Sequence, residues 1–232
     1  MKLSTQASMV APYAVWMALM AVLPATAWAY AVRSGVTLAT LLVALFACRR
    51  IRDGRDFWDI WRPCRANAQA SQSNDVAAKP LLLGIFAGIV VWALWVLPEN
   101  LPIYKEWFII GADSATSSAA GASAPSPYAP AVCGWPLTLV RLLGSAFVIP
   151  AVEEIFFRGW LYRWLGADKA AFFWMVALFA VEHDRFLVGA LAGAAYGLIA
   201  LRAGLFSAIV AHTVTNLILG IQVIALCHWD FW

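Results

Sequence analysis

The feature that most constrains the fold of this chain is a succession of long apolar runs. They cover residues 10–32, 36–48, 81–97, 136–152, 171–181, 186–201 and 205–227. A helix needs about 20 consecutive apolar residues to cross a bilayer, and within lipid it satisfies all its own backbone hydrogen bonds. The runs therefore predict an all-α, polytopic transmembrane helix bundle with about seven spans, or six to eight if the short runs are counted differently.

Composition excludes an ordinary soluble enzyme. Hydrophobic residues make up 63% of the chain and charged residues only 12%, whereas soluble domains carry about 25% charged residues. At 232 residues the chain is long enough for one compact bundle, so we expect a single membrane domain over residues 1–232. The net charge is only +3, which predicts no nucleic-acid partner and leaves the lipid bilayer as the expected surrounding.

The distribution of Lys and Arg predicts how the bundle is oriented. A basic segment runs from Arg49 to Arg65, and such segments lie on the cytoplasmic side. This places the N-terminus in the cytoplasm and the C-terminus outside, in what we expect to be a bacterial inner (plasma) membrane. The first run would also fit a cleavable secretory signal, because Lys2 precedes an apolar core and small residues. The same orientation puts further basic residues on the cytoplasmic half: Arg158, Arg163, Lys169 and Arg202.

Adjacent carboxylates in an apolar stretch are the best indication of function. Glu153, Glu154 and Arg158 interrupt the run VIPAVEEIFFRGW. An ionisable side chain near the bilayer centre costs about 2.5–3.5 kcal/mol on insertion scales, so it usually faces the protein interior. Glu154 and Arg158 have the spacing of an intrahelical ion pair, while Glu153, about 100° further around the helix, can address another neighbour. We expect the two glutamates to share a proton.

Two of the three histidines lie in other apolar segments. His183 follows one run, and His212 stands one helical turn before Asn216 in another. A carboxylate could take a proton from water while a histidine orients it and other donors bind an oxyanion, which suits hydrolysis of an amide or ester. Each motif alone would also fit a structural role, as a helix-end charge cluster or an interhelical hydrogen bond. Their joint occurrence predicts one cavity that opens toward the cytoplasmic side.

A glycine stripe lies between the two histidines. Gly189, Gly193 and Gly197 recur every four residues and so share one face of a helix. We interpret this face as a site of close helix packing, with a substrate groove as the alternative.

Three motifs, taken together and in this order, resemble a known family. They are EExxxR at 153–158, FxxxH at 179–183 and HxxxN at 212–216. These are similar to the motifs of the CAAX protease and bacteriocin-processing family (Abi, CPBP), a group of intramembrane proteases. The resemblance covers roughly residues 136–220, and the short amino-terminal half is similar to bacterial CAAX prenyl protease-related proteins.

The resemblance implies an intramembrane endopeptidase that acts on a membrane-associated peptide or protein, prenylated or not. Glu153 would activate water together with His183, and Glu154 would assist or shape its ionisation. His212 and Asn216 would stabilise the oxyanion. Some of the related bacterial proteins accompany exosortase systems, which implies an exosortase-system partner. The implied catalytic residues are Glu153, Glu154, His183, His212 and Asn216, with Arg158 as structural support.

Two alternatives to a metal-free protease stay open at this stage. Members of the family were long described as metalloproteases, and Glu153, His183 and His212 could supply zinc ligands. However, the chain has no HExxH motif, Asn is a poor zinc ligand, and the four cysteines form no CxxC pair, so we expect no metal cofactor. The other alternative is a non-catalytic membrane protein, an immunity or scaffolding factor that uses the polar cluster to bind a partner.

Overall fold

The computed structural model describes residues 3–50, 78–100 and 125–232. The basic segment that follows Arg50, and most of the Ser- and Pro-rich stretch before Pro130, lie outside these residues. Within the described ranges all regular structure is helical and there is no β-strand. This confirms the predicted all-α class.

Six helical stretches are long and apolar enough to cross a membrane. α1, α2 and α4 come from the amino-terminal half, and α11 and α12 close the carboxy-terminal half. The remaining stretch, which we call the motif helix, is the helical segment Pro130–Trp164, which is kinked at Gly134 and carries both glutamates. The polytopic bundle is thus confirmed. Its elements are α1 (Leu3–Val22), α2 (Ala27–Arg50), α4 (Ala78–Val96), η2 (Leu97–Asn100), α7 (Pro130–Leu143), η3 (Gly144–Val148), α8 (Ile149–Glu154), η4 (Ile155–Leu161), α9 (Tyr162–Trp164), α10 (Lys169–Val181), α11 (Phe186–Ala203), α12 (Leu205–Leu226) and η5 (Trp229–Phe231).

The boundary between the first two helices differs from the expected one. The apolar runs predicted a break after residue 32, whereas α1 ends at Val22 and α2 begins at Ala27. Pro24 explains the break, because proline lacks the N–H that a continuing helix would use. Arg33 does not interrupt α2: it is 6% exposed, and its Nη2 donates to the Pro24 carbonyl oxygen over 3.4 Å.

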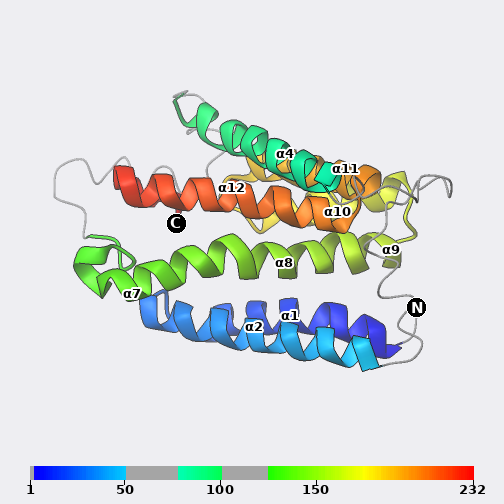
Figure 1. Ribbon diagram of the computed structural model, residues 1–232, viewed down its shortest axis with the longest axis horizontal. Coiled ribbons are helices and arrows are strands. Elements are labelled where there is room, and N and C mark those ends of the chain that lie inside the picture. Colours follow the sequence, from blue (N-terminus) through cyan, green and yellow to red (C-terminus); the bar gives the residue numbers. More distant parts are fainter. Residues whose placement is uncertain (1–2, 51–77, 101–124) are drawn as a thin grey trace.

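Figure 1 shows that the long helices run back and forth between two ends of the bundle. At one end α2 and α11 finish and α10 begins; we call it the basic end, because Arg50, Lys169 and Arg202 lie there. At the other end α1 and α12 finish and α7 begins. The motif helix passes between the α1–α2 pair and the pair formed by α4 and α12, so it forms the centre of the molecule (Figure 1).

α10 is shorter than the six candidate spans, although its apolar run was counted among them. Its 13 residues rise by about 20 Å, which is less than the roughly 30 Å of a hydrocarbon core. The helix begins at the basic end, where the Asp168 side chain accepts a hydrogen bond from the Ala171 N–H over 2.8 Å. Its far end therefore stops inside the bundle, which is where His183 follows.

The glycine stripe of α11 packs against α10, as predicted. A Cβ atom on Gly193 would come within 2.9 Å of Phe179 Cδ1, and one on Gly197 within 2.8 Å of Phe172 Cε2. On Gly189 it would lie 3.2 Å from the Cβ atom of His183. Only glycine lets the two helices approach so closely, and this approach brings the end of α10 against α11.

Candidate active site

An irregularity in the motif helix creates a free backbone acceptor beside the site. η3 is a π-helical segment in which the Ile149 N–H bonds to the Gly144 carbonyl rather than to that of Ser145. In π-helical register the donor for Ser145 would be Pro150, which has no N–H. Asn216 fills the gap, because its Nδ2 donates to the Ser145 carbonyl oxygen over 2.9 Å. The proline and the π segment thus fix which way the Asn216 amide faces.

Glu154 is the centre of a fully buried polar network. It is 0% exposed, and its Oε1 accepts from Arg158 Nη1 and from His212 Nδ1, each over 3.0 Å. The pair with Arg158 is the intrahelical ion pair that the spacing predicted. Arg158 Nη2 also donates to the Gly193 carbonyl oxygen over 2.8 Å. The network therefore ties the motif helix to α11 and α12.

His212 links the two glutamates. A carboxylate oxygen accepts, so the 3.0 Å contact with Glu154 requires a proton on His212 Nδ1. The other ring nitrogen, Nε2, lies 3.7 Å from Glu153 Oε2, which is longer than a hydrogen bond. Tyr196 stacks on the imidazole with ring centroids 4.5 Å apart. The ring is thus held in one orientation, with Nε2 on the side of Glu153.

His183 is fixed by the backbone of the helix that precedes it. Its Nδ1 lies 2.8 Å from the Phe179 carbonyl oxygen, and since a carbonyl only accepts, Nδ1 carries the proton. Burial lowers the pKa of His183 to about 4, so the ring is neutral near pH 7 and Nε2 is a hydrogen-bond acceptor. The rings of Trp95 and Phe179 pack on it with centroids 5.5 and 4.7 Å away.

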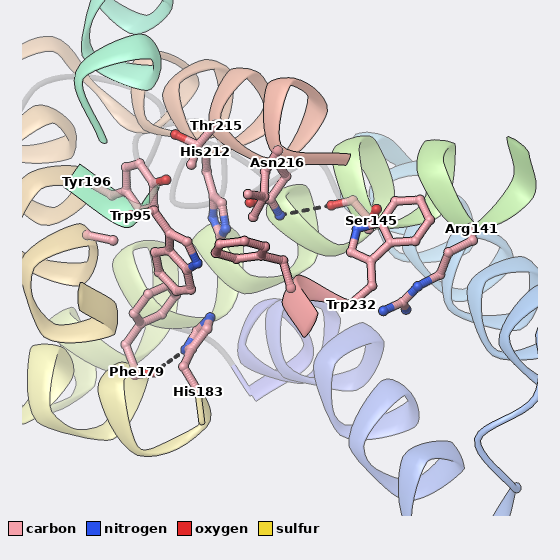
Figure 2. A pocket seen from close by; sticks show the side chains of 13 residues that line it. Trp95, Arg141, Ser145, Phe179, His183, Tyr196, His212, Thr215, Asn216 and Trp232 are labelled. Atoms are coloured by element: carbon pink, nitrogen blue, oxygen red, sulfur yellow. Dashed lines mark hydrogen bonds between the residues drawn. The ribbon is translucent and has the colours of Figure 1, made fainter. Parts of the chain in front are cut away.

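These side chains border two adjoining hollows of about 160 Å³ and 300 Å³. His183, His212 and Asn216 line both, and Glu153 lines the larger. Figure 2 shows the smaller hollow, with the two imidazoles on one side and Asn216 bound to Ser145 beside them. The structure therefore brings together four of the predicted site residues from three elements. Glu154 and Arg158 line neither hollow.

The cavity extends in a different direction from the one expected. We expected it to open toward the cytoplasmic side, where the basic residues gather. Its lining from the motif helix runs from Glu153 back to Arg141, and its lining from α1 lies between Trp16 and Met20, near the end of that helix. All of these residues lie between Glu153 and the end opposite the basic one. On the basic side of Glu153 the interior is filled by the network around Glu154 and Arg158.

Sequence reasoning missed four residues of this site. Trp95 and Tyr196 hold the histidines, but aromatic residues in apolar runs look like ordinary core. Arg141 lines both hollows and could have been found as an isolated cation in the run 136–152. Glu182 lines the larger hollow and stands next to the FxxxH histidine. The residue is exposed as a whole, and the partial burial of its carboxyl raises its pKa to about 7.

The described residues do not fit a metal site. Nowhere in the described ranges do three His, Cys, Asp or Glu side chains stand together in a way that could hold a metal ion. No step below is therefore routed through a metal.

The fold and the geometry define a class of protein: an integral membrane helix bundle with a carboxylate and two histidines around an internal cavity. Residues 135–218 match the family model described as type II CAAX prenyl endopeptidase Rce1-like. This match agrees with the family resemblance that the three motifs predicted for this part of the chain. No curated protein and no solved structure matches the chain.

Proposed function

We propose that this chain is an intramembrane endopeptidase that hydrolyses a peptide bond of a membrane-associated substrate, with water activated by Glu153 and no metal. The family supports a CAAX-type endopeptidase. The observation that carries the finer proposal is that the two neighbouring glutamates have different surroundings. Glu153 faces the larger hollow, whereas Glu154 is enclosed by Arg158 and His212.

In this mechanism Glu153 is the general base. Its carboxylate takes a proton from water, and the neutral His183 accepts the second hydrogen bond of that water through Nε2. The oxygen attacks the peptide carbonyl, and Glu153 returns its proton to the leaving nitrogen. One water is thus divided between a new carboxyl group and a new amine.

The oxyanion needs donors that are already in place. Asn216 has a second N–H on Nδ2, because the Ser145 carbonyl occupies only one. His212 lies between two carboxylates, with Nδ1 bonded to Glu154 and Nε2 on the side of Glu153. When both of its ring nitrogens carry a proton, Nε2 can donate to the oxyanion. Glu154 acts on the reaction only through the position of this ring.

An inactive variant should identify the substrate, because the substrate then accumulates uncleaved. Membranes from cells that produce Glu153→Gln should accumulate an uncleaved membrane protein that disappears with the wild-type chain. The purified wild-type protein in lipid nanodiscs should then cleave that protein, and activity should survive strong chelation. Equal accumulation with both chains would favour the immunity or scaffolding alternative. Loss of activity with chelator, regained with stoichiometric zinc, would overturn the metal-free mechanism.

The orientation and the partners are further proposals. If the basic end lies in the cytoplasm, as the Lys and Arg bias predicts, the N-terminus is cytoplasmic and the C-terminus extracytoplasmic. An exosortase-system partner stays a prediction.

A further inference from the structure

We propose that Arg141 is a binding residue for a carboxylate group of the substrate, and that this carboxylate reaches the site from the end of the bundle opposite the basic end. The inference rests on the proposed function and deepens it by naming what the cavity recognises. Among the described residues, Arg141 is the one arginine or lysine that lines both hollows.

The guanidinium of Arg141 has a fixed place but no described anionic partner. Its Cζ lies 4.1 Å from the ring centroid of Tyr30, 4.6 Å from that of Tyr128 and 5.4 Å from that of Trp232. Its Nε atom is buried and has no hydrogen-bond partner. Among the described residues no Asp or Glu forms an ion pair with it. Stacked rings orient a guanidinium, yet they leave its N–H groups without a charged acceptor.

This arrangement contrasts with that of Arg158, the other arginine of the centre. Arg158 is 5% exposed and bonds to Glu154 and to the Gly193 carbonyl oxygen. A charge placed in an apolar interior is costly unless it is paired. Nε of both arginines is buried without a hydrogen-bond partner, but Arg158 is paired with a carboxylate. Arg141 is half-buried at a cavity wall and forms no ion pair with a described Asp or Glu. Figure 2 shows Arg141 on the far side of Ser145 and Asn216 from His183, beside Trp232.

The rest of the cavity indicates that the carboxylate belongs to a peptide. Between Arg141 and Glu153 the larger hollow is bordered by apolar side chains, among them Trp16, Met20 and Ile149. Arg141 thus lies at one end of an apolar hollow that is also lined by Glu153, the proposed base. This arrangement suits an apolar peptide segment that ends in a carboxylate or is flanked by one. Arginine binds carboxylates in a two-pronged geometry.

The spacing sets the length of that segment. Arg141 and Glu153 lie twelve positions apart on the motif helix (153 − 141), which corresponds to about 18 Å. An extended peptide covers about 3.3–3.6 Å per residue. The carboxylate should therefore lie about five residues from the scissile bond. With the basic end in the cytoplasm, it would enter from the extracytoplasmic side.

A binding experiment tests this without requiring hydrolysis. The Glu153→Gln protein in phosphatidylcholine nanodiscs is titrated with a fluorescent hexapeptide of leucine and alanine, followed by fluorescence anisotropy. Three forms are compared: the free C-terminal acid, the C-terminal amide, and an amide whose last residue is glutamate. We expect at least one carboxylate form to bind about tenfold or more tightly than the plain amide. Comparing the free acid with the glutamate amide shows whether the site prefers a terminal or a side-chain carboxylate.

Variants assign the effect to Arg141. Adding Arg141→Gln should abolish the preference for the carboxylate, and Arg141→Lys should retain part of it, because lysine keeps the charge but not the two-pronged geometry. The matched control is Arg202→Gln, which removes an exposed guanidinium at the basic end. If Arg141→Gln does not fold, the lysine variant decides, because a merely structural role would leave its carboxylate preference at the full value.

The outcomes that overturn the inference are distinct from those that overturn the proteolysis. Equal binding of all three peptides, or a preference unchanged in Arg141→Gln, would refute it even if the wild-type chain is a protease. A preference that vanishes when phosphatidylglycerol is added, with Arg141-dependent lipid binding, would assign Arg141 to a lipid headgroup instead. A wild-type chain without hydrolytic activity would refute the proposed function and leave the binding result standing.

Discussion

The buried network around Glu154 and the cavity around Glu153 use the same residue types and meet at His212. In the network, Oε1 of Glu154 accepts hydrogen bonds from Arg158 and from His212, each over 3.0 Å. In the cavity, Glu153 Oε2 lies 3.7 Å from His212 Nε2, and the side chain lines the larger hollow. Two neighbouring glutamates thus differ because Oε1 of Glu154 is bonded to two side chains inside the protein, whereas Glu153 has no such short contact. The bonded carboxylate can hold the structure, and the one that faces the cavity is left to react.

The first prediction concerns Glu153, the glutamate that faces the cavity. Glu153→Gln keeps the size of the side chain but cannot accept a proton from water, so turnover should fall by about 10²–10⁴. Its thermal unfolding in detergent should match that of the wild-type chain, since Glu153 makes no short ion pair. The measurement is a purified proteolysis assay together with a melting curve. A fully active Glu153→Gln protein would disprove the role of Glu153.

The second prediction concerns the buried network around Glu154. Arg158→Ala leaves Glu154 as a buried carboxylate with one partner fewer, and breaking such a pair costs about 3–5 kcal/mol of unfolding free energy. Glu154→Gln should be destabilising for the same reason, and it should lower turnover less than Glu153→Gln does. Denaturant unfolding checks both. Wild-type stability in Arg158→Ala would show that the network does not hold the bundle together.

The third prediction concerns the donor that the π segment positions. Asn216→Ala should lower kcat by about 10²–10³ and change KM little, as expected when an oxyanion donor is lost. Ser145→Ala is the matched control, because Asn216 bonds to the backbone of Ser145 and not to its hydroxyl. A large rise in KM with unchanged kcat would instead make Asn216 a substrate-binding residue.

The fourth and smallest effect concerns pH. The raised pKa of Glu182, about 7, means that its carboxyl is neutral below this pH and gains a negative charge above it. That charge would face the same hollow as Glu153 and disfavour the oxyanion, so the wild-type rate should decline by about two- to fivefold relative to that of Glu182→Gln as pH rises through 7. Glu182→Gln should lack this decline. An identical pH profile for both proteins would show that Glu182 does not influence the reaction.

The sequence predicted the helices and much of the site because polar residues in apolar runs are conspicuous. Glu154, Arg158 and Gly193 were found in this way. It misplaced the end of α1, because the buried Arg33 looked like a break whereas Pro24 made the actual one. It could not predict the direction of the cavity, which depends on how the short α10 and the Glu154 network fill one side of the bundle.

The two π segments also affect how residue-by-residue accessibility or cross-linking data along the motif helix are assigned to helix faces. Each segment, η3 and η4, adds a residue to a turn, and one residue corresponds to a rotation of about 100°. A single helical wheel drawn over Pro130–Trp164 would therefore assign faces wrongly on either side of α8. Accessibility or cross-linking data have to be read in three separate angular registers, before η3, within α8 and after η4. Deleting one residue from Gly144–Val148 would turn Arg141 by about 100° relative to Glu153, and it would also move the Ser145 carbonyl that holds Asn216.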